Sequence, residues 1–305
     1  MATIDDVATG GPPGQKPRRK LTGYWLILPG AVWLLVFFVI PFYSLLAASL
    51  FDPNGSPITG YDVTFHVQNY WDAIVQYKSQ IWRSIWYAGV ATFLCLVVGY
   101  VLAYAIAFKA GRWKNLMLVL VIAPFFTSFL LRTLSWQLIL ADDGWVVNVA
   151  QAIHLTNLLD LVGLTDGDRL LATPFAVIAG LTYNFLPFMV LPLYASLEKV
   201  DFRLIEAAGD LYASPIRGFF KVTFPLSLPG VVAGTLLTFI PAAGDYVNAQ
   251  LLGNTNTRMV GNSIQSLFTS QGDYAAAGAL SVILMVIIVA AVMAYVRTAG
   301  TEELV

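Results

Sequence analysis

Residues 206–225 read E-A-A-G-D-L-Y-A-S-P-I-R-G-F-F-K-V-T-F-P and interrupt two strongly apolar segments of the chain. Asp201 is a suitable N-cap for an amphipathic helix over about 202–213. The polar face of that helix carries Arg203, Glu206 and Asp210. Ser214 and Pro215 then end the first helix and begin another, because serine caps a helix and proline fits its first turn. The stretch therefore predicts a short helix–turn–helix lying against a bilayer.

The composition supports a membrane location for the rest of the chain. Of its 305 residues 58% are hydrophobic and 11% are charged, and the mean hydropathy is +0.71. A soluble domain carries about 25% charged residues. The single Cys95 and two distant histidines, His66 and His154, provide neither a disulfide framework nor a metal site. The net charge of −1 gives no indication of nucleic-acid binding. We therefore expect an all-α, polytopic membrane protein.

Six apolar runs are each long enough to cross about 30 Å of hydrocarbon. They lie at 24–50, 84–108, 116–140, 173–197, 228–250 and 275–297. If both termini lie inside, the cytoplasmic segments hold most of the 17 lysines and arginines, as the positive-inside rule requires. The outer segments keep only Lys78, Arg83, Arg169 and Arg258. We therefore expect six transmembrane helices with both termini in the cytoplasm.

The segments on the outer side have their own predicted structure. An interfacial helix is expected over 66–78, a further helix outside the bilayer over 145–162, and a less regular stretch that dips toward the membrane over 251–273. Prolines inside the spans predict kinks at Pro124, Pro187, Pro192 and Pro241. Aspartates outnumber basic residues on this side, which would concentrate a cation there.

The stretch 206–225 resembles the EAA loop of ABC importer permeases. That pattern is E-A-A, three residues, Gly, nine residues, an aliphatic residue, any residue and Leu-Pro. The matching positions are Glu206, Ala207, Ala208, Val222 and Pro225. Tyr212 stands where the family usually has Gly, and Phe224 replaces the Leu.

The resemblance implies a type I ABC importer permease (MetI-like) fold in the plasma (inner) membrane. It divides the chain into a flexible basic tail over 1–20 and one permease domain over 21–305, with the EAA loop at about 198–226. The implied partners are a second related permease, two ATPase subunits, an extracytoplasmic substrate-binding protein and membrane lipid. The residues implied to touch the ATPase are Glu206, Ala207 and Ala208, with Arg203 and Asp210 as weaker candidates.

The chain itself is expected to be a non-catalytic subunit. It has no G-x-x-x-x-G-K-[ST] motif, so we expect no cofactor in this chain and assign ATP and Mg to the partner ATPase. It also lacks H-E-x-x-H and a nucleophile elbow, which argues against an intramembrane enzyme.

Asp245 is the main candidate for contact with a substrate. A charge in the fifth apolar run is costly and usually marks a transport path or a buried partner. Arg132, in the third run, comes out at a similar depth when residues are counted along straight helices. Two readings stay open, a structural Arg132–Asp245 ion pair and a substrate-facing Asp245, and both hold if the pair opens during transport.

Aromatic and acidic residues complete the candidate site, with Tyr183 expected deeper in the membrane than Asp245 and two aspartates expected at the outer mouth. The residues are Trp136, Tyr183, Tyr246, Asp142 and Asp143. Carboxylates and ring faces together suit an alkylammonium ion, since the acid supplies charge and the ring adds cation–π attraction. Each aromatic residue alone is also compatible with packing or with a position at the lipid headgroups.

Three further runs resemble the permease of spermidine/putrescine importers, in its B-type subunit. They are A-P-F-F-T-S-F-L-L-R-T-L-S-W (123–136), L-P-F-M-V-L-P-L-Y-A-S-L-E-K (186–199) and I-P-A-A-G-D-Y-V (240–247). The resemblance spans about 24–297 and implies import of polyamines. The alternatives are the same importer class with a sugar, an anion or an amino acid derivative as cargo, or a membrane scaffold without transport.

Overall fold

The computed structural model describes residues 21–55 and 60–299, so the predicted basic tail over 1–20 lies outside the described residues. The described residues form helices and no strands, apart from two isolated β-bridges. The chain divides into two compact units at the boundary between Leu46 and Ala47. The predicted all-α architecture is confirmed.

The first unit contains the first apolar helix. It consists of α1 (Leu21–Leu34), a π-helical turn η1 (Leu35–Val39) and the start of α2 (Ile40–Ala48). The apolar span Ile27–Ala48 matches the run expected at 24–50. Its large apolar side chains from Ile27 to Ile40 are exposed, which suits a helix that faces lipid.

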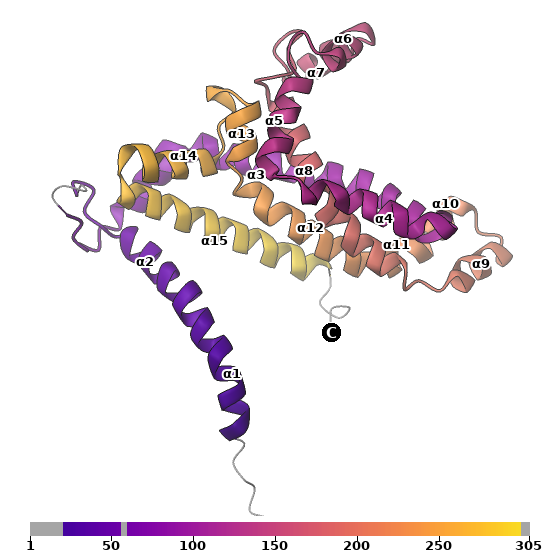
Figure 1. Ribbon diagram of the computed structural model, residues 1–305, viewed down its shortest axis with the longest axis horizontal. Coiled ribbons are helices and arrows are strands. Elements are labelled where there is room, and N and C mark those ends of the chain that lie inside the picture. The colour runs from indigo at the N-terminus through magenta and orange to yellow at the C-terminus, as the bar shows by residue number, and fades with distance from the viewer. Residues whose placement is uncertain (1–20, 56–59, 300–305) are drawn as a thin grey trace, which may run out of the picture. The chain divides into compact units, whose positions relative to one another are not determined.

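The second unit is built on four helices. They are α3 (Gln68–Tyr104), which continues into the π-turn η2 (Ala105–Lys109), α8 (Pro174–Leu197), α12 (Leu228–Ala243) and α15 (Tyr274–Ala299). α3 packs against α8, α12 and α15, and α12 also packs against α8 (Figure 1). α3, α8 and α15 each contain an unbroken apolar span, in agreement with three predicted runs.

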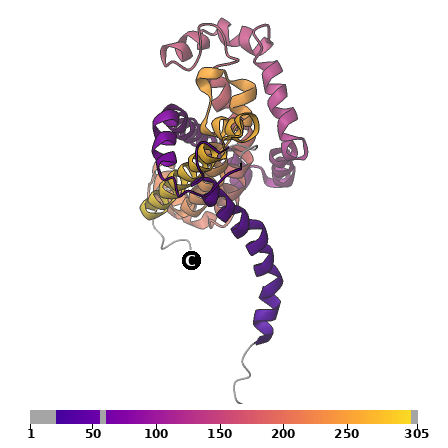
Figure 2. The ribbon, with the colours of Figure 1, turned by 90° about the vertical axis from the view of Figure 1, so that its left-hand side faces the viewer.

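Two other spans are bent. The run expected at 116–140 forms η3 (Gly111–Trp113), α4 (Lys114–Ile122), η4 (Ala123–Phe126) and α5 (Phe129–Ile139), with a 94° bend before α5. The kink predicted at Pro124 thus lies close to the observed bend, and Figure 2 shows α5 leaving the bundle. The segment Pro215–Leu226 likewise meets α12 at 66°. Counting each bent pair as one span gives six candidate spans among the described residues.

The three segments expected outside the bilayer are all largely helical, with bounds that differ from the prediction. The helix expected at 66–78 is the first part of α3, which kinks at Tyr77 (φ −108°, ψ 15°) and continues. The region 145–162 splits into α6 (Trp145–Ala152) and α7 (Leu155–Leu161), because His154 has a left-handed backbone. The region 251–273 is largely helical. It contains the end of α13 (Val247–Leu252), then η6 (Thr255–Thr257), α14 (Val260–Ser266) and η7 (Leu267–Gln271).

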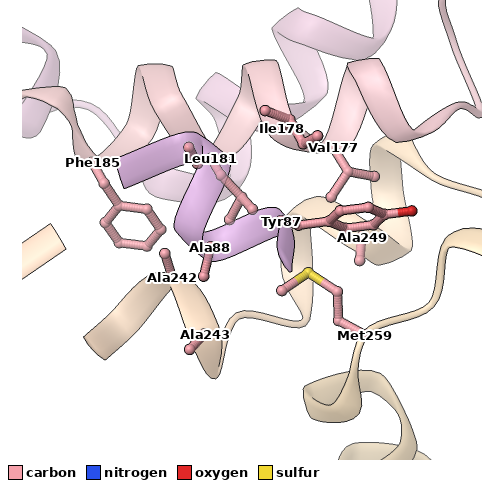
Figure 3. Packing of buried hydrophobic residues seen from close by; sticks show 11 residues of the cluster. Tyr87, Ala88, Val177, Ile178, Leu181, Phe185, Ala242, Ala243, Ala249 and Met259 are labelled. Carbon is pink, nitrogen blue, oxygen red and sulfur yellow. The ribbon is translucent and has the colours of Figure 1, made fainter. Parts of the chain in front are cut away.

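One apolar cluster holds the middle of the second unit together. Figure 3 shows this cluster, in which Tyr87 and Ala88 of α3 pack against α8. α8 contributes Leu181 and Phe185 among others, and Met259 completes the cluster. These side chains are buried, and small alanines from α12 and α13 fill the gaps between the larger ones. Beyond this cluster along α3, the Cys95 thiol donates a hydrogen bond to the Thr182 carbonyl at 3.3 Å.

α12 approaches α8 closely at Gly230. A Cβ atom at this position would lie 2.6 Å from Ser196 Cβ and 2.7 Å from the Pro192 carbonyl oxygen. Small residues at helix contacts allow this approach in membranes, where packing rather than hydrophobic burial drives association. The contact leaves no room for any side chain.

We expect Gly230→Ala to lower the unfolding temperature in detergent, because overpacking of this kind costs about 1–3 kcal/mol. Thermal unfolding followed by circular dichroism measures the change. Gly89→Ala on α3 is the matched control, since a Cβ there would meet nothing within 4 Å. Equal unfolding temperatures for the two variants would contradict the close-contact explanation.

Candidate functional site

The helix–turn–helix expected at 201–225 forms as predicted at both caps. α9 (Phe202–Asp210) begins at Asp201, whose Oδ1 accepts the Arg203 N–H at 3.0 Å. α10 (Pro215–Gly218) begins at Ser214, whose Oγ accepts the Arg217 N–H at 3.4 Å. Proline occupies the first position of α10. The π-turn η5 (Phe219–Thr223) and α11 (Phe224–Leu226) then lead into α12.

α9 ends earlier than predicted, at Asp210 rather than near 213. The Tyr212 N–H bonds the Gly209 carbonyl at 2.9 Å, and the Ala213 N–H bonds the Ala208 carbonyl at 3.0 Å. These two bonds form a Schellman motif, which places residue 212 in the left-handed region (φ 58°). A tyrosine therefore occupies the position where a helix usually ends with glycine, and where the EAA pattern has Gly.

The coupling candidates share an accessible surface on α9. The side chains of Arg203, Glu206, Ala207 and Asp210 are exposed, and Ala208 is half-buried. Large apolar side chains beside them are also exposed, namely Leu204, Leu211, Tyr212, Ile216 and Phe220. Charged and large apolar groups next to each other are typical of a surface that contacts another protein.

α9 connects to the bundle beside a cavity. The cavity, of about 600 Å³, lies between the end of α8, the start of α9 and the start of α12. Near the same helix end, the Lys114 ammonium donates to Glu198 Oε1 at 2.7 Å and so links α4 to the residue that follows α8. The hydrogen bond from Lys114 holds the pKa of Glu198 below its ordinary value. This pair fixes the end of α8 just before α9 begins.

The sequence suggested that Asp245 lies on the fifth helix, but the structure places it in a turn after that helix. α12 ends at Ala243, and Asp245 precedes the short helix α13. One carboxylate oxygen of Asp245, Oδ1, accepts the Asn248 backbone N–H at 2.8 Å and the Asn248 Nδ2–H at 3.1 Å. The carboxylate thus receives two hydrogen bonds from neutral donors.

A chain of buried polar side chains leads from Asp245 to two other helices. Asn184 of α8 donates its Nδ2–H to Asn248 Oδ1 at 3.0 Å and to Thr133 Oγ1 of α5 at 3.2 Å. The three side chains are at most 1% exposed. α5, α8 and α13 meet at this chain (Figure 1). We call Thr133, Asn184, Asn248 and Asp245 the amide relay.

The turn that carries Asp245 is also fixed from α14. A Cβ at Gly261 would lie 2.6 Å from the Gly244 carbonyl oxygen and 3.0 Å from that of Asp245. Asn262 donates its Nδ2–H to the Tyr246 carbonyl at 2.8 Å. The backbone on both sides of Asp245 is therefore in contact with the start of α14.

Arg132 and Asp245 do not form the ion pair that the sequence suggested. Within the described part of the chain, neither side chain has an oppositely charged partner within 4 Å. The Arg132 guanidinium lies 5.2 Å from the Phe125 ring centre and 5.7 Å from that of Phe129. It is buried, and its Nε and Nη1 make no hydrogen bond. The count along straight helices does not apply to Arg132, because the chain bends by 94° before α5.

The other substrate candidates divide into two groups. The Trp136 and Tyr183 rings pack together, with centres 5.5 Å apart, and Tyr183 adjoins Asn184 of the relay. Asp142 instead pairs with Arg169, whose Nε lies 3.2 Å from the Asp142 Oδ2. Asp142 and Asp143 are exposed and make no hydrogen bond or ion pair with the relay residues described above. Tyr246 is 43% exposed and joins the site through its backbone carbonyl.

Asn184 and Asn248 were not among the predicted site residues. Each is an amide inside an apolar run expected to cross the membrane, and polar side chains there usually face a partner or a path. That signal was present in the sequence. Which amide meets which could not be read from it, because the two asparagines lie 64 positions apart.

Comparisons with known proteins give one consistent family. Residues 96–299 match the family described as "Binding-protein-dependent transport system inner membrane component". The chain is 37% identical over 266 residues to the spermidine/putrescine transport system permease protein PotB of Haemophilus influenzae, covering 87% of this chain and 90% of that protein. It is 33% identical over 267 residues to PotB of Escherichia coli K12, covering 87% and 93%.

Solved structures support the fold. A bacterial ABC transporter involved in import of the acidic polysaccharide alginate aligns with a TM-score of 0.67 at 17% identity, covering 93% of this chain and 97% of that one. The MetNI methionine ABC transporter in an inward-facing conformation aligns with a TM-score of 0.51 at 20% identity, covering 72% and 94%. At these identities the likeness concerns the fold alone.

We expect Tyr212→Gly to stabilise the end of α9, because a left-handed backbone costs a residue with a Cβ about 1 kcal/mol or more. Amide hydrogen exchange at residues 212 and 213 should slow by about fivefold, measured by mass spectrometry in detergent. Tyr212→Ala is the control, since alanine keeps the strained Cβ. Equal slowing in the alanine variant would show that the tyrosine ring, and not the backbone, sets the exchange rate.

Proposed function

This chain belongs to the family of binding-protein-dependent transport system inner membrane components, and we propose that its cargo is an aliphatic polyamine such as spermidine or putrescine. The chain is a transmembrane permease subunit of an ABC importer. The identity to PotB proteins, 37% and 33% over most of the chain, supports the choice of polyamines.

The observation that carries the proposal is that the Asp245 carboxylate has neutral hydrogen-bond donors and no cationic partner among the described residues. Its hydrogen bonds come from Asn248, a neutral residue, and no lysine, arginine or histidine of the described chain lies within ion-pair distance. A desolvated carboxylate is stable when a cation approaches it, and an alkylammonium ion provides both a charge and N–H donors. The Trp136 and Tyr183 rings, which pack against each other, would add cation–π attraction if the cargo passes them.

The proposed assembly rests on the resemblance of the chain to ABC importer permeases. A second related permease would complete the path, an external binding protein would deliver the cargo, and two ATPase subunits would bind ATP and Mg on the cytoplasmic side. α9 would enter a groove on an ATPase and transmit its closure to the bundle through the end of α8. This orientation places both termini of the chain in the cytoplasm.

A second candidate cargo is favoured by Arg132. Its buried guanidinium has unpaired N–H donors, which an anionic solute would satisfy. Competition for uptake into proteoliposomes between labelled putrescine and unlabelled spermidine, a dicarboxylate or a neutral sugar separates the two. Putrescine uptake inhibited by spermidine alone supports the polyamine, and absence of putrescine uptake by the active importer supports the other cargo.

We expect Glu206→Arg to abolish co-purification of the ATPase with the tagged permease, because it reverses the charge on the exposed face of α9. The measurement is the amount of ATPase recovered per permease. Asp143→Arg makes the same charge change at an exposed aspartate between α5 and α6 and should leave recovery unchanged. Full recovery with Glu206→Arg would argue against α9 as the docking helix.

We expect Asp245→Asn to raise the KM for putrescine uptake by about tenfold or more, because a hydrogen bond to a charged group is lost. Asp273→Asn is a close control, since Asp273 accepts the Ala276 N–H at 2.9 Å as Asp245 accepts that of Asn248. In both variants the side-chain oxygen of the introduced asparagine can still accept the backbone hydrogen bond. An unchanged KM in Asp245→Asn proteoliposomes would remove Asp245 from the proposed site.

A further inference from the structure

The amide relay has a fixed direction, set at its far end by Thr133. The Thr133 hydroxyl donates its proton to the Phe129 carbonyl at 3.1 Å. Its oxygen can then only accept from Asn184, so Asn184 must present its Nδ2 group to Thr133. The same Nδ2 group donates to Asn248 Oδ1. The orientation of the Asn184 amide is therefore determined by a backbone carbonyl of α5.

The orientation of Asn248 follows from that of Asn184. Because Asn248 Oδ1 accepts from Asn184, its Nδ2 group points at Asp245 Oδ1. A reversed Asn248 amide would place two oxygens together at Asp245 and two NH₂ groups together at Asn184. Both contacts would be repulsive, and the burial of Asn184 and Asn248 leaves little room for relief.

The relay ends on a charge that it does not neutralise. Asp245 Oδ1 is occupied by the two donors of Asn248, while Oδ2 accepts no hydrogen bond from the described residues. A lysine or arginine at position 248 would satisfy the carboxylate and also cancel its charge. Asparagine fixes the carboxylate and leaves the charge for an external cation.

Resting on the proposed function, we propose that Asn184 and Asn248 are positioning residues for recognition of a protonated amine. They hold the Asp245 carboxylate in one orientation, with Oδ2 directed to the cargo, by donors that carry no charge. They do not touch the cargo themselves. Loss of the relay therefore weakens cation binding without slowing the conformational cycle.

The test is a double-mutant cycle on putrescine uptake by the complete importer in proteoliposomes. Asn248→Ala removes the side-chain donor but keeps the backbone N–H that caps α13 through Asp245. We expect its KM to rise about tenfold, with the maximum rate within about twofold of the unmodified importer. The same substitution in an Asp245→Asn background should leave KM unchanged.

Asn184→Leu tests the far end of the relay. It replaces Asn248→Ala in the test if that variant assembles poorly. Asn69→Leu is the matched control, because Asn69 is a buried amide that bonds the Ser49 and Phe51 carbonyls, away from the relay. It should change the yield of the complex and not the KM.

Two results would overturn the proposal. One is an unchanged KM in Asn248→Ala and Asn184→Leu. The other is a rise in KM of the same size with and without the Asp245 carboxylate, which would indicate a purely structural role. If Asp245→Asn alone has no effect on KM, the assignment of Asp245 fails as well, so the two failures are distinguishable.

Discussion

Hydrocarbon offers no hydrogen-bond partner to a backbone N–H or C=O group, and this constraint governs where the helices of this chain can break. Each break is supplied with local partners. Before α5, the Thr127 N–H and hydroxyl both bond the Pro124 carbonyl. After α12, the Asp245 carboxylate accepts an N–H of α13, and Asn262 donates to the Tyr246 carbonyl. The polar side chains that make the second break possible are the ones that build the candidate site.

Two opposite charges lie near the start of α5 and the end of α12, and each is held by neutral groups. Aromatic rings flank Arg132, and amides hold Asp245. Burying a charge costs several kcal/mol unless a partner compensates it. Neither charge has an ion-pair partner within the described part of this chain. We therefore expect the cargo or neighbouring subunits to supply the partners of these two charges.

The sequence determines the local features well and the long-range ones poorly. The caps at Asp201 and Ser214 were predictable because cap chemistry involves residues only two or three positions apart. The spans of α8 and α15 followed from the length of their apolar runs. A kink at Pro124 was predicted from the proline, but its size, 94°, and the end of α12 at Ala243 were not. Nor was the contact between Asn184 and Asn248, because the two asparagines lie 64 positions apart.

The single thiol of the chain has a practical consequence for observing motion. Cys95 is fully buried and its sulfur bonds a carbonyl of the neighbouring helix. A maleimide or nitroxide reagent has no access to it in the folded state. A cysteine introduced on the exposed face of α9 and another on the loop after α5 would then be the only reactive thiols of this chain. Spectroscopic distances between two such labels can follow the importer through turnover in an otherwise natural background.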